Sequence, residues 1–176
     1  MTRYLRIPTP LGPMLLVSDR HALTGAYFTG QKYDATPQPD WIEDASHPVL
    51  AEACRQLGEY FAGTRTRFDL PLRSSGTPFQ ARVWQALLAI PAGETWTYGA
   101  IARAVGEPAA VRAAGAAIGR NPISVIVPCH RVIGADGSLT GYAGGLDRKR
   151  RLLALEASVS TPLLRAQGAE PGVRAA

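Results

Sequence analysis

The sequence predicts an α/β (α+β) protein with two unlike halves, and three observations support this. Short apolar runs broken by turn residues fill positions 3–29, helical apolar spacing dominates after residue 76, and the small polar stretch "RSSG" at 73–76 separates the two patterns. We therefore expect a strand-rich α/β domain over residues 1–75, a helical domain over 76–157 and a loosely held tail over 158–176. With 176 residues, 46% of them apolar, the chain can bury a core.

The first half predicts an antiparallel sheet with one helix. The runs "YLRIP", "MLLVS" and "LTGAYF" are typical of a meander, and residues 31–40 of an exposed loop. A helix should follow from Ser46, with Pro48 near its first turn, to the stop at Gly63, because apolar residues recur there at helical spacing: Leu50, Ala53, Cys54, Leu57 and Phe61. The stretch "TRFDLPL" at 66–72 predicts one more short strand.

The second half opens with a strong helix signal. Thr77 can cap a helix that has Pro78 at its first position, and Gln80 completes a capping box. One face of this helix is apolar: Phe79, Val83, Leu87 and Ile90. Trp84 is most simply a core residue.

Two short helices with a tight connection then predict a helix-turn-helix, giving a C-terminal domain of winged-helix-like type. Thr97 can cap "YGAIARAV", and "GEP" leads into "AAVRAAGAAIG" at 109–119. The second helix has an apolar side made of Val111, Ala114, Ala117 and Ile118, with Arg112 off that stripe. Next we expect "ISVIVP" at 123–128 to be extended and a last helix, capped by Asp147, to span 148–156.

Charge and composition limit the function classes. The net charge of +5, from 19 basic and 14 acidic residues, agrees with a polyanionic partner without requiring one. No run of 18 apolar residues occurs, and "MTRYLRIPTPLG" lacks the apolar region of a signal peptide, so we expect a cytoplasmic protein. Cys54 and Cys129 should be free thiols. The histidines and Cys54 are too scattered to predict a metal site.

The segment "VIVPCHRVIG" at 125–134 carries the best candidate for chemistry. Pro128 should bend the chain and fix Cys129, and a neighbouring His or helix N-terminus lowers a thiol pKa below about 8.5, which favours a thiolate. The alternative is that Cys129 is a small buried hydrophobe. Adjacent side chains diverge, so direct contact with His130 is not assured and a bridging water is expected. Glu156 can orient the imidazole, although a lone helical Glu is usually solvated.

Other segments have two interpretations each. Arg112, among small residues, is an ordinary surface arginine or a cation that enters a DNA groove. "GYAGG" at 141–145 is a flexible loop or allows close approach of a flat ligand. "DRKRR" at 147–151 is a solvated helix start or a phosphate-contacting patch.

Taken together, "TYGAIARAVGEPAAVRAAGAAIGRNPI", "VPCHRVIG" and "LTGYAGGLDRKRRLLALE" resemble the O6-alkylguanine-DNA alkyltransferase family, also called methylated-DNA–protein-cysteine methyltransferases, over residues 77–157. The resemblance implies that Cys129 accepts the alkyl group, that His130 is a water-mediated general base, and that Glu156 is the outer member of the relay. Asn121 would hold the active-site turn.

The resemblance also implies DNA contacts and a base pocket. Arg112 would fill the gap left by a flipped nucleotide, with Ala113 and Arg131 as further DNA contacts. Tyr98 would lie at the nucleotide's phosphate and donate a proton to the ring. The base pocket would be formed by five residues: Trp84, Val132, Tyr142, Ala143 and Gly144. Ala143 replaces a Ser of some relatives, and Ser124 a Pro.

The family would make this protein a suicide DNA-repair transferase that acts once on O6-alkylguanine, and on O4-alkylthymine, after base flipping. It implies a monomer that binds duplex DNA, through the minor groove, with no cofactor and no metal. Two other classes stay open from the residues alone. A DNA-binding module would leave the thiol idle, and a hydrolytic cysteine enzyme would turn over repeatedly without DNA.

Overall fold

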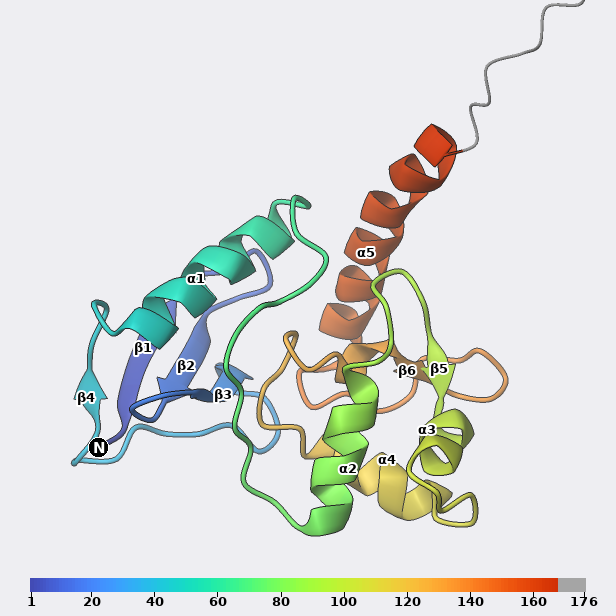
Figure 1. The fold of residues 1–176 in the computed structure, drawn as a ribbon, viewed down its shortest axis with the longest axis horizontal. Coiled ribbons are helices and arrows are strands. Elements are labelled where there is room, and N and C mark those ends of the chain that lie inside the picture. Colours follow the sequence, from blue (N-terminus) through green and yellow to red (C-terminus); the bar gives the residue numbers. More distant parts are fainter. Residues whose placement is uncertain (168–176) are drawn as a thin grey trace, which may run out of the picture.

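The N-terminal half contains a four-stranded sheet with one helix across it. In this computed structural model, which describes residues 1–167 and the side chains of 1–160, β1 (Arg3–Ile7), β2 (Met14–Ser18) and β3 (Leu23–Phe28) form the predicted antiparallel meander. A two-residue strand, β4 (Ile42–Glu43), adds a parallel edge to β1 and gives the order β3-β2-β1-β4. Helix α1 (Pro48–Phe61) lies over this sheet (Figure 1).

The buried stripe of α1 differs from the prediction at its end. Its members are Leu50, Ala53, Gln56, Leu57 and Tyr60, so that Tyr60 rather than Phe61 faces the core. Gly63, with φ of +78°, follows the helix as expected. The predicted strand at 66–72 is wrong: only Leu72 bridges Leu23. The amide of Gln56 instead bonds the backbone N–H and C=O of Asp69, at 2.8 and 2.9 Å, which takes the place of a strand ladder.

The C-terminal half is mainly helical, as predicted. Helix α2 (Pro78–Leu87) begins with the Thr77–Gln80 capping box, and α3 (Tyr98–Ala104) is capped by the Thr97 hydroxyl. Helix α4 (Val111–Gly119) packs against both. Val111 is exposed, unlike the rest of its predicted stripe. Strand β5 (Trp96–Thr97) pairs in parallel with β6 (Val132–Ile133).

The segment after α4 is a turn, and the prediction of an extended run at 123–128 is wrong. Only Ile123 continues a sheet, through a bridge to Ala26 of β3. Val125 then takes a φ of +72°, and the Val127 N–H donates to the Ile123 carbonyl at 3.0 Å. Asn121 supports this turn by its side chain, and so the chain enters a short 3-10 helix, η1 (Cys129–Arg131), as a bend rather than a strand.

Helix α5 (Leu146–Gln167) extends away from α2, α3 and α4 (Figure 1) and is longer than predicted. Asp147 lies in its first turn and is not the cap, because the helix begins at Leu146. Residues 158–167, predicted as part of a tail, continue the helix, while 168–176 lie outside the described residues. No described helix is long and apolar enough to cross a membrane.

One hydrophobic core joins the two halves. Phe28 and Leu57 of the N-terminal half belong to the same buried cluster as Ile123, Cys129 and Leu152. Backbone hydrogen bonds at the β3 edge reinforce this contact: the Ala26 N–H donates to the Pro122 carbonyl, and the Ser124 N–H to the Ala26 carbonyl. The segment that leads to Cys129 is therefore held against the N-terminal sheet.

The capping box of α2 provides a test of the fold. Thr77→Ala should lower the free energy of unfolding by about 1 kcal/mol, because the Gln80 N–H loses its side-chain acceptor. Urea unfolding followed by circular dichroism measures the change. Thr77→Ser keeps the acceptor and should unfold nearly as the parent does; an equal loss in both variants would contradict the role of the cap.

Candidate active site around Cys129

Cys129 begins η1 and is only 5% exposed. The Nδ2 group of Asn121 donates to its Sγ at 3.1 Å and to the Val127 carbonyl at 2.8 Å. The Oδ1 atom of Asn121 accepts from the Ile123 N–H at 3.0 Å. The side-chain amide of Asn121 thus holds both the turn and the sulfur. The resemblance implies the same role for Asn121.

The resting sulfur is a thiol, and the expectation of a thiolate is wrong. Burial raises the pKa of Cys129, and the nearby Asn121 amide and Lys149 ammonium only partly oppose this. A nucleophile in this place needs a base to remove its proton when it reacts.

His130 can supply that base. Its Nε2 lies 2.7 Å from Oε1 of Glu156. Although burial acts to raise the pKa of Glu156, the hydrogen bonds from His130 and Arg131 and the charge of Arg131 lower it to about 2, so this carboxylate is ionised and can only accept. The Nε2 of His130 must therefore carry a proton, which leaves the lone pair on Nδ1.

The state of the imidazole fits this role. Burial lowers the pKa of His130, so the ring is neutral near pH 7. Its Nδ1 is buried and has no hydrogen-bond partner among the described residues. Nor does any hydrogen bond among them join the ring to Sγ of Cys129, so a bridging water stays the prediction.

Arg131 is part of the buried network, and its predicted DNA contact is wrong for this conformation. Its Nε and Nη2 donate to the two oxygens of Glu156, at 2.9 and 2.8 Å, and Nη1 donates to the Ile90 carbonyl at 2.6 Å. The side chain is 7% exposed. A guanidinium bonded in this way cannot reach a phosphate.

Lys149 is a buried cation that the sequence analysis did not single out. Its Nζ donates to the carbonyls of Val132, Thr140 and Gly141, at 2.5, 2.8 and 3.3 Å. Burial lowers its pKa to about 8. The interpretation of residues 147–151 as a phosphate-contacting patch is therefore wrong for Lys149. Its position three and seven residues before Leu152 and Glu156, which share its helix face, was the signal that could have identified it.

A cavity of about 450 Å³ lies beside this network. Its wall includes Tyr98, Tyr142 and Ala143, three of the predicted pocket and DNA residues, together with small residues of α4. The Tyr98 hydroxyl donates to the Thr140 carbonyl at 2.9 Å. Cys129 does not line the cavity directly. Tyr142 does, and its pKa is raised well above 10, first by burial and then by the neighbouring Cys129.

The cavity rim also contains two residues of the N-terminal half that the prediction missed. Lys32 and Tyr33 line it, and the Lys32 N–H donates to the Ala143 carbonyl at 3.0 Å. The cations of Lys32 and Arg120 both lie over the Tyr33 ring, 4.9 and 4.7 Å from its centroid. Lys32 and Tyr33 lie in the loop predicted at 31–40, which has no periodic pattern of apolar residues, so the sequence did not indicate that they line a cavity.

The three other residues predicted to form the base pocket differ in where they lie. Gly144 is buried beside the Tyr142 ring, where an added Cβ would lie 2.7 Å from a ring carbon. Val132 is fully buried, and its carbonyl accepts from Lys149. Trp84 is not a pocket residue: its Nε1 donates to the Ala117 carbonyl at 2.8 Å, and its ring is buried between α2 and α4.

Arg112 and Ala113 are exposed in the first turn of α4. Arg112 precedes three cavity-lining residues by three, four and seven positions: Gly115, Ala116 and Gly119. Residues so spaced share one helix face. Arg112 therefore lies on the face of α4 that lines the cavity, although it is not itself a lining residue.

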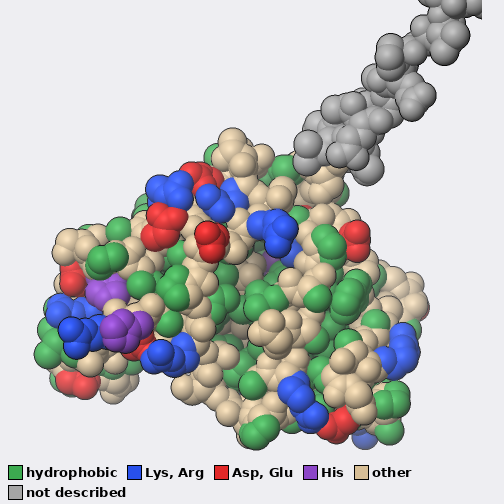
Figure 2. Space-filling model, viewed as in Figure 1, with side chains coloured by type: hydrophobic (Ala, Val, Ile, Leu, Met, Phe, Trp, Pro, Cys, Tyr) green, Lys and Arg blue, Asp and Glu red, His purple; other side chains and the backbone are tan. Residues whose placement is uncertain are grey.

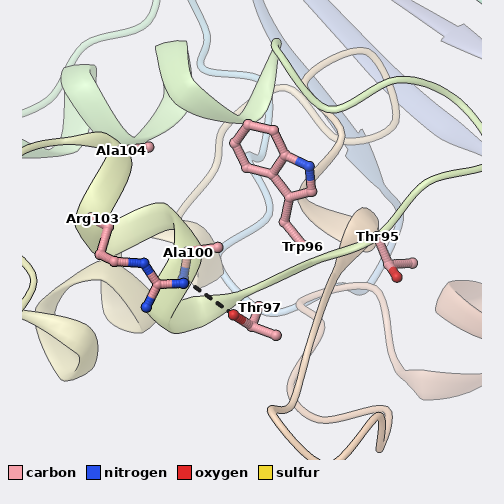
Figure 3. A pocket seen from close by; sticks show the side chains of 6 residues that line it. All are labelled: Thr95, Trp96, Thr97, Ala100, Arg103 and Ala104. Atoms are coloured by element: carbon pink, nitrogen blue, oxygen red, sulfur yellow. Dashed lines mark hydrogen bonds between the residues drawn. The ribbon is translucent and has the colours of Figure 1, made fainter.

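A second cavity, of about 590 Å³, lies at β5 and α3. Figure 3 shows Trp96 and Arg103 on its wall, with the Thr97 hydroxyl bonded to the Ala100 N–H. None of its lining residues belongs to the Cys129 network. On the face in Figure 2, Lys and Arg side chains lie among acidic ones and form no continuous basic surface. No group of three potential metal ligands occurs among the described residues.

Comparison with known proteins shows the family of the chain. The model of the 6-O-methylguanine DNA methyltransferase DNA-binding domain matches residues 78–158, and that of the ribonuclease-like domain of the same enzyme matches 2–74. The chain belongs to the 6-O-methylguanine DNA methyltransferase family. The family prediction is thereby confirmed.

Relatives cover nearly the whole chain. The methylated-DNA–protein-cysteine methyltransferase of Mycobacterium tuberculosis H37Rv is 50% identical over 158 residues, which are 90% of this chain and 94% of the relative. That of Methanosarcina acetivorans is 50% identical over 88% of this chain and 98% of its own length. The crystal structure of M. tuberculosis OGT in complex with DNA superposes with a TM-score of 0.82, over 89% of this chain and 94% of that one, and confirms the fold class.

The buried Glu156 carboxylate makes a testable contribution to stability. Glu156→Gln should lower the free energy of unfolding at pH 7 by about 3 kcal/mol, because the Arg131 guanidinium stays buried without a counter-charge. The folded pKa of about 2 lies below the unfolded value of about 4.3. This stabilisation is therefore complete above pH 4.3 or so and is lost as the pH falls through the folded pKa.

Urea unfolding of both proteins between pH 7 and pH 2 measures this effect. Glu94→Gln, at an exposed turn, is the matched control and should stay close to the parent throughout. If the difference in free energy of unfolding between the parent and Glu156→Gln stayed constant from pH 7 to pH 2, the assignment of an ionised carboxylate would be contradicted.

Proposed function

We propose that this protein repairs duplex DNA by transferring the alkyl group of O6-alkylguanine, and of O4-alkylthymine, irreversibly to Cys129. The observation that carries the proposal is a buried thiol next to a neutral imidazole whose Nδ1 lone pair is free, with a cavity for a planar base alongside. Relatives that are 50% identical are named for transfer from methylated DNA to a protein cysteine.

The chemistry follows from the protonation states. His130 Nδ1 takes the thiol proton through a water, and the carboxylate of Glu156 stabilises the resulting imidazolium. The sulfur attacks the alkyl carbon, an S–C bond forms as the C–O6 bond breaks, and the electron pair stays on guanine. A proton then returns to the guanine ring, with the Tyr98 hydroxyl as donor. The thioether has no good leaving group, so each molecule reacts once.

Access to the thiol requires that the nucleotide leave the base stack. A stacked base cannot bring O6 to a sulfur that is 5% exposed, and extrusion costs a few kcal/mol. The 450 Å³ cavity accommodates the base between Tyr98 and the 141–143 loop. Arg112, on the face of α4 that lines the cavity, fills the gap in the duplex.

The remaining parts of the proposal concern partners. The helix-turn-helix of α3 and α4 binds duplex DNA, and Arg112 with Ala113 enters the minor groove, where small residues allow close approach. The protein acts as a monomer and needs no cofactor or metal. It works in the cytoplasm, where reducing conditions keep Cys129 a free thiol.

Intact mass spectrometry tests the transfer. After incubation with a duplex containing O6-methylguanine, the protein should gain one methyl group, and peptide mapping should place it on Cys129. Cys54→Ala is the matched control and should react like the parent, whereas Cys129→Ala should gain nothing. The proposal fails if the parent stays unmodified; a parallel duplex with O4-methylthymine tests the second substrate.

The role of Arg112 predicts a substrate-dependent defect. Arg112→Ala should slow methyl transfer from duplex DNA at least about tenfold, because the extruded state loses the side chain that fills the duplex gap. Transfer from the free base O6-methylguanine should be unchanged. Single-turnover rates on both substrates measure this, with Arg150→Ala on exposed α5 as control. Equal loss on both substrates would assign Arg112 to the active site itself.

A further inference from the structure

We infer that Tyr60, in the N-terminal half, is a positioning residue for the transfer: its hydroxyl, bonded to Glu156, keeps His130 available as a base. The inference rests on the function proposed above and adds a residue from outside the Cys-His-Arg segment. It depends on three donors converging on one carboxylate oxygen.

The geometry at that oxygen is specific. The Tyr60 hydroxyl donates to Oε1 of Glu156 at 2.7 Å. The same oxygen accepts from His130 Nε2 at 2.7 Å and from Arg131 Nη2 at 2.8 Å. Among the described residues, only Nε of Arg131 bonds the other oxygen, at 2.9 Å. The phenol and the imidazole therefore compete for the same negative charge.

Tyr60 is held in place for this contact. It is 2% exposed, at the core side of α1, and its ring contacts Phe61 and Phe68, with centroids 5.3 and 5.4 Å away. Burial, and then the charge of Glu156, raises the pKa of Tyr60 far above its ordinary value. The phenol is therefore a neutral donor throughout the pH range from 5 to 9.

Competition at Oε1 has a predictable direction. Each donor that shares the carboxylate charge weakens its attraction for a positive imidazolium. The other charged or titratable groups that face His130 are Arg131 and Lys149, and those that face Tyr60 are Arg131 and Tyr142, beside Glu156 itself. Without the phenol, Oε1 binds the imidazolium more tightly and the pKa of His130 rises. A ring that is already protonated cannot take the thiol proton.

Tyr60→Phe removes the hydroxyl and keeps the ring, so it separates this role from simple packing. In both proteins the rate of methyl transfer should fall at low pH, as His130 becomes protonated. In Tyr60→Phe the midpoint of this fall should lie at a pH about 0.5 unit or more above that of the parent. Its rate on the alkaline plateau should stay close to that of the parent. Single-turnover rates between pH 5 and 9, on duplex DNA with O6-methylguanine, give the profile.

The matched control is Tyr27→Phe. It removes a hydroxyl from β3 of the same half, from a tyrosine that makes no hydrogen bond to Glu156, and its profile should overlay that of the parent. An NMR titration of the imidazole signals provides a second measurement that needs no activity. Of the three histidines, only His130 should move in Tyr60→Phe, while His21 and His47 should not.

A further replacement protects the test against misfolding of Tyr60→Phe. Site-specific 3-fluorotyrosine at position 60 keeps the hydroxyl and makes it a stronger donor, so the pKa of His130 should fall rather than rise. If both replacements leave the His130 titration and the rate profile unchanged, the inference is overturned while the transfer function stands. If the parent transfers no methyl group, the proposed function fails, and the NMR titration still decides whether Tyr60 controls the imidazole.

Discussion

The ionised carboxylate of Glu156 is the group on which the site depends. It is buried at 2% exposure and accepts from His130, Arg131 and Tyr60, which come from η1 and α1. A buried charge without partners would be strongly destabilising, so each donor contributes to keeping the carboxylate ionised. The same bonds fix η1 against α5 and set the tautomer of His130. The hydrogen bonds to Glu156 therefore both stabilise the fold and set the protonation state of His130 that the proposed chemistry needs.

Burial of Cys129 has a matching consequence. A thiol with a raised pKa is a weak nucleophile toward small electrophiles in solution, and its position beside Tyr142 restricts contact with them further. Reactivity then requires the imidazole and a substrate in the cavity at the same time. Under the proposed function, in which Cys129 reacts once, a neutral, buried resting state limits wasteful alkylation better than a free thiolate would.

Local signals predicted most of the elements. The Thr77 capping box, the Thr97 cap and the spacing in α1 depend only on neighbours along the chain, and all appear in the structure. The errors at 66–72 and 123–128 share a cause: side-chain amides of Gln56 and Asn121 bond the backbone there, which no strand pattern reveals. Arg131 was misassigned and Tyr60 was missed, because a buried polar partner distant in sequence leaves no periodic trace. Lys149 was missed although its spacing to Leu152 and Glu156 places it on the buried face of α5.

The two sequence-defined halves form one functional unit. Three hydrogen bonds connect the N-terminal half to the site. Gln31 accepts from the hydroxyl of Ser124, in the turn before Cys129, at 3.2 Å, and the Lys32 N–H donates to the carbonyl of Ala143 in the cavity loop. The Tyr60 hydroxyl donates to Glu156 of the relay. The Gln31–Ser124 and Tyr60–Glu156 contacts join buried polar groups that would otherwise lack this partner, which makes separation of the halves costly. The cysteine motif alone is therefore not the site: its geometry is set jointly by η1, α5 and the domain that carries no motif of its own.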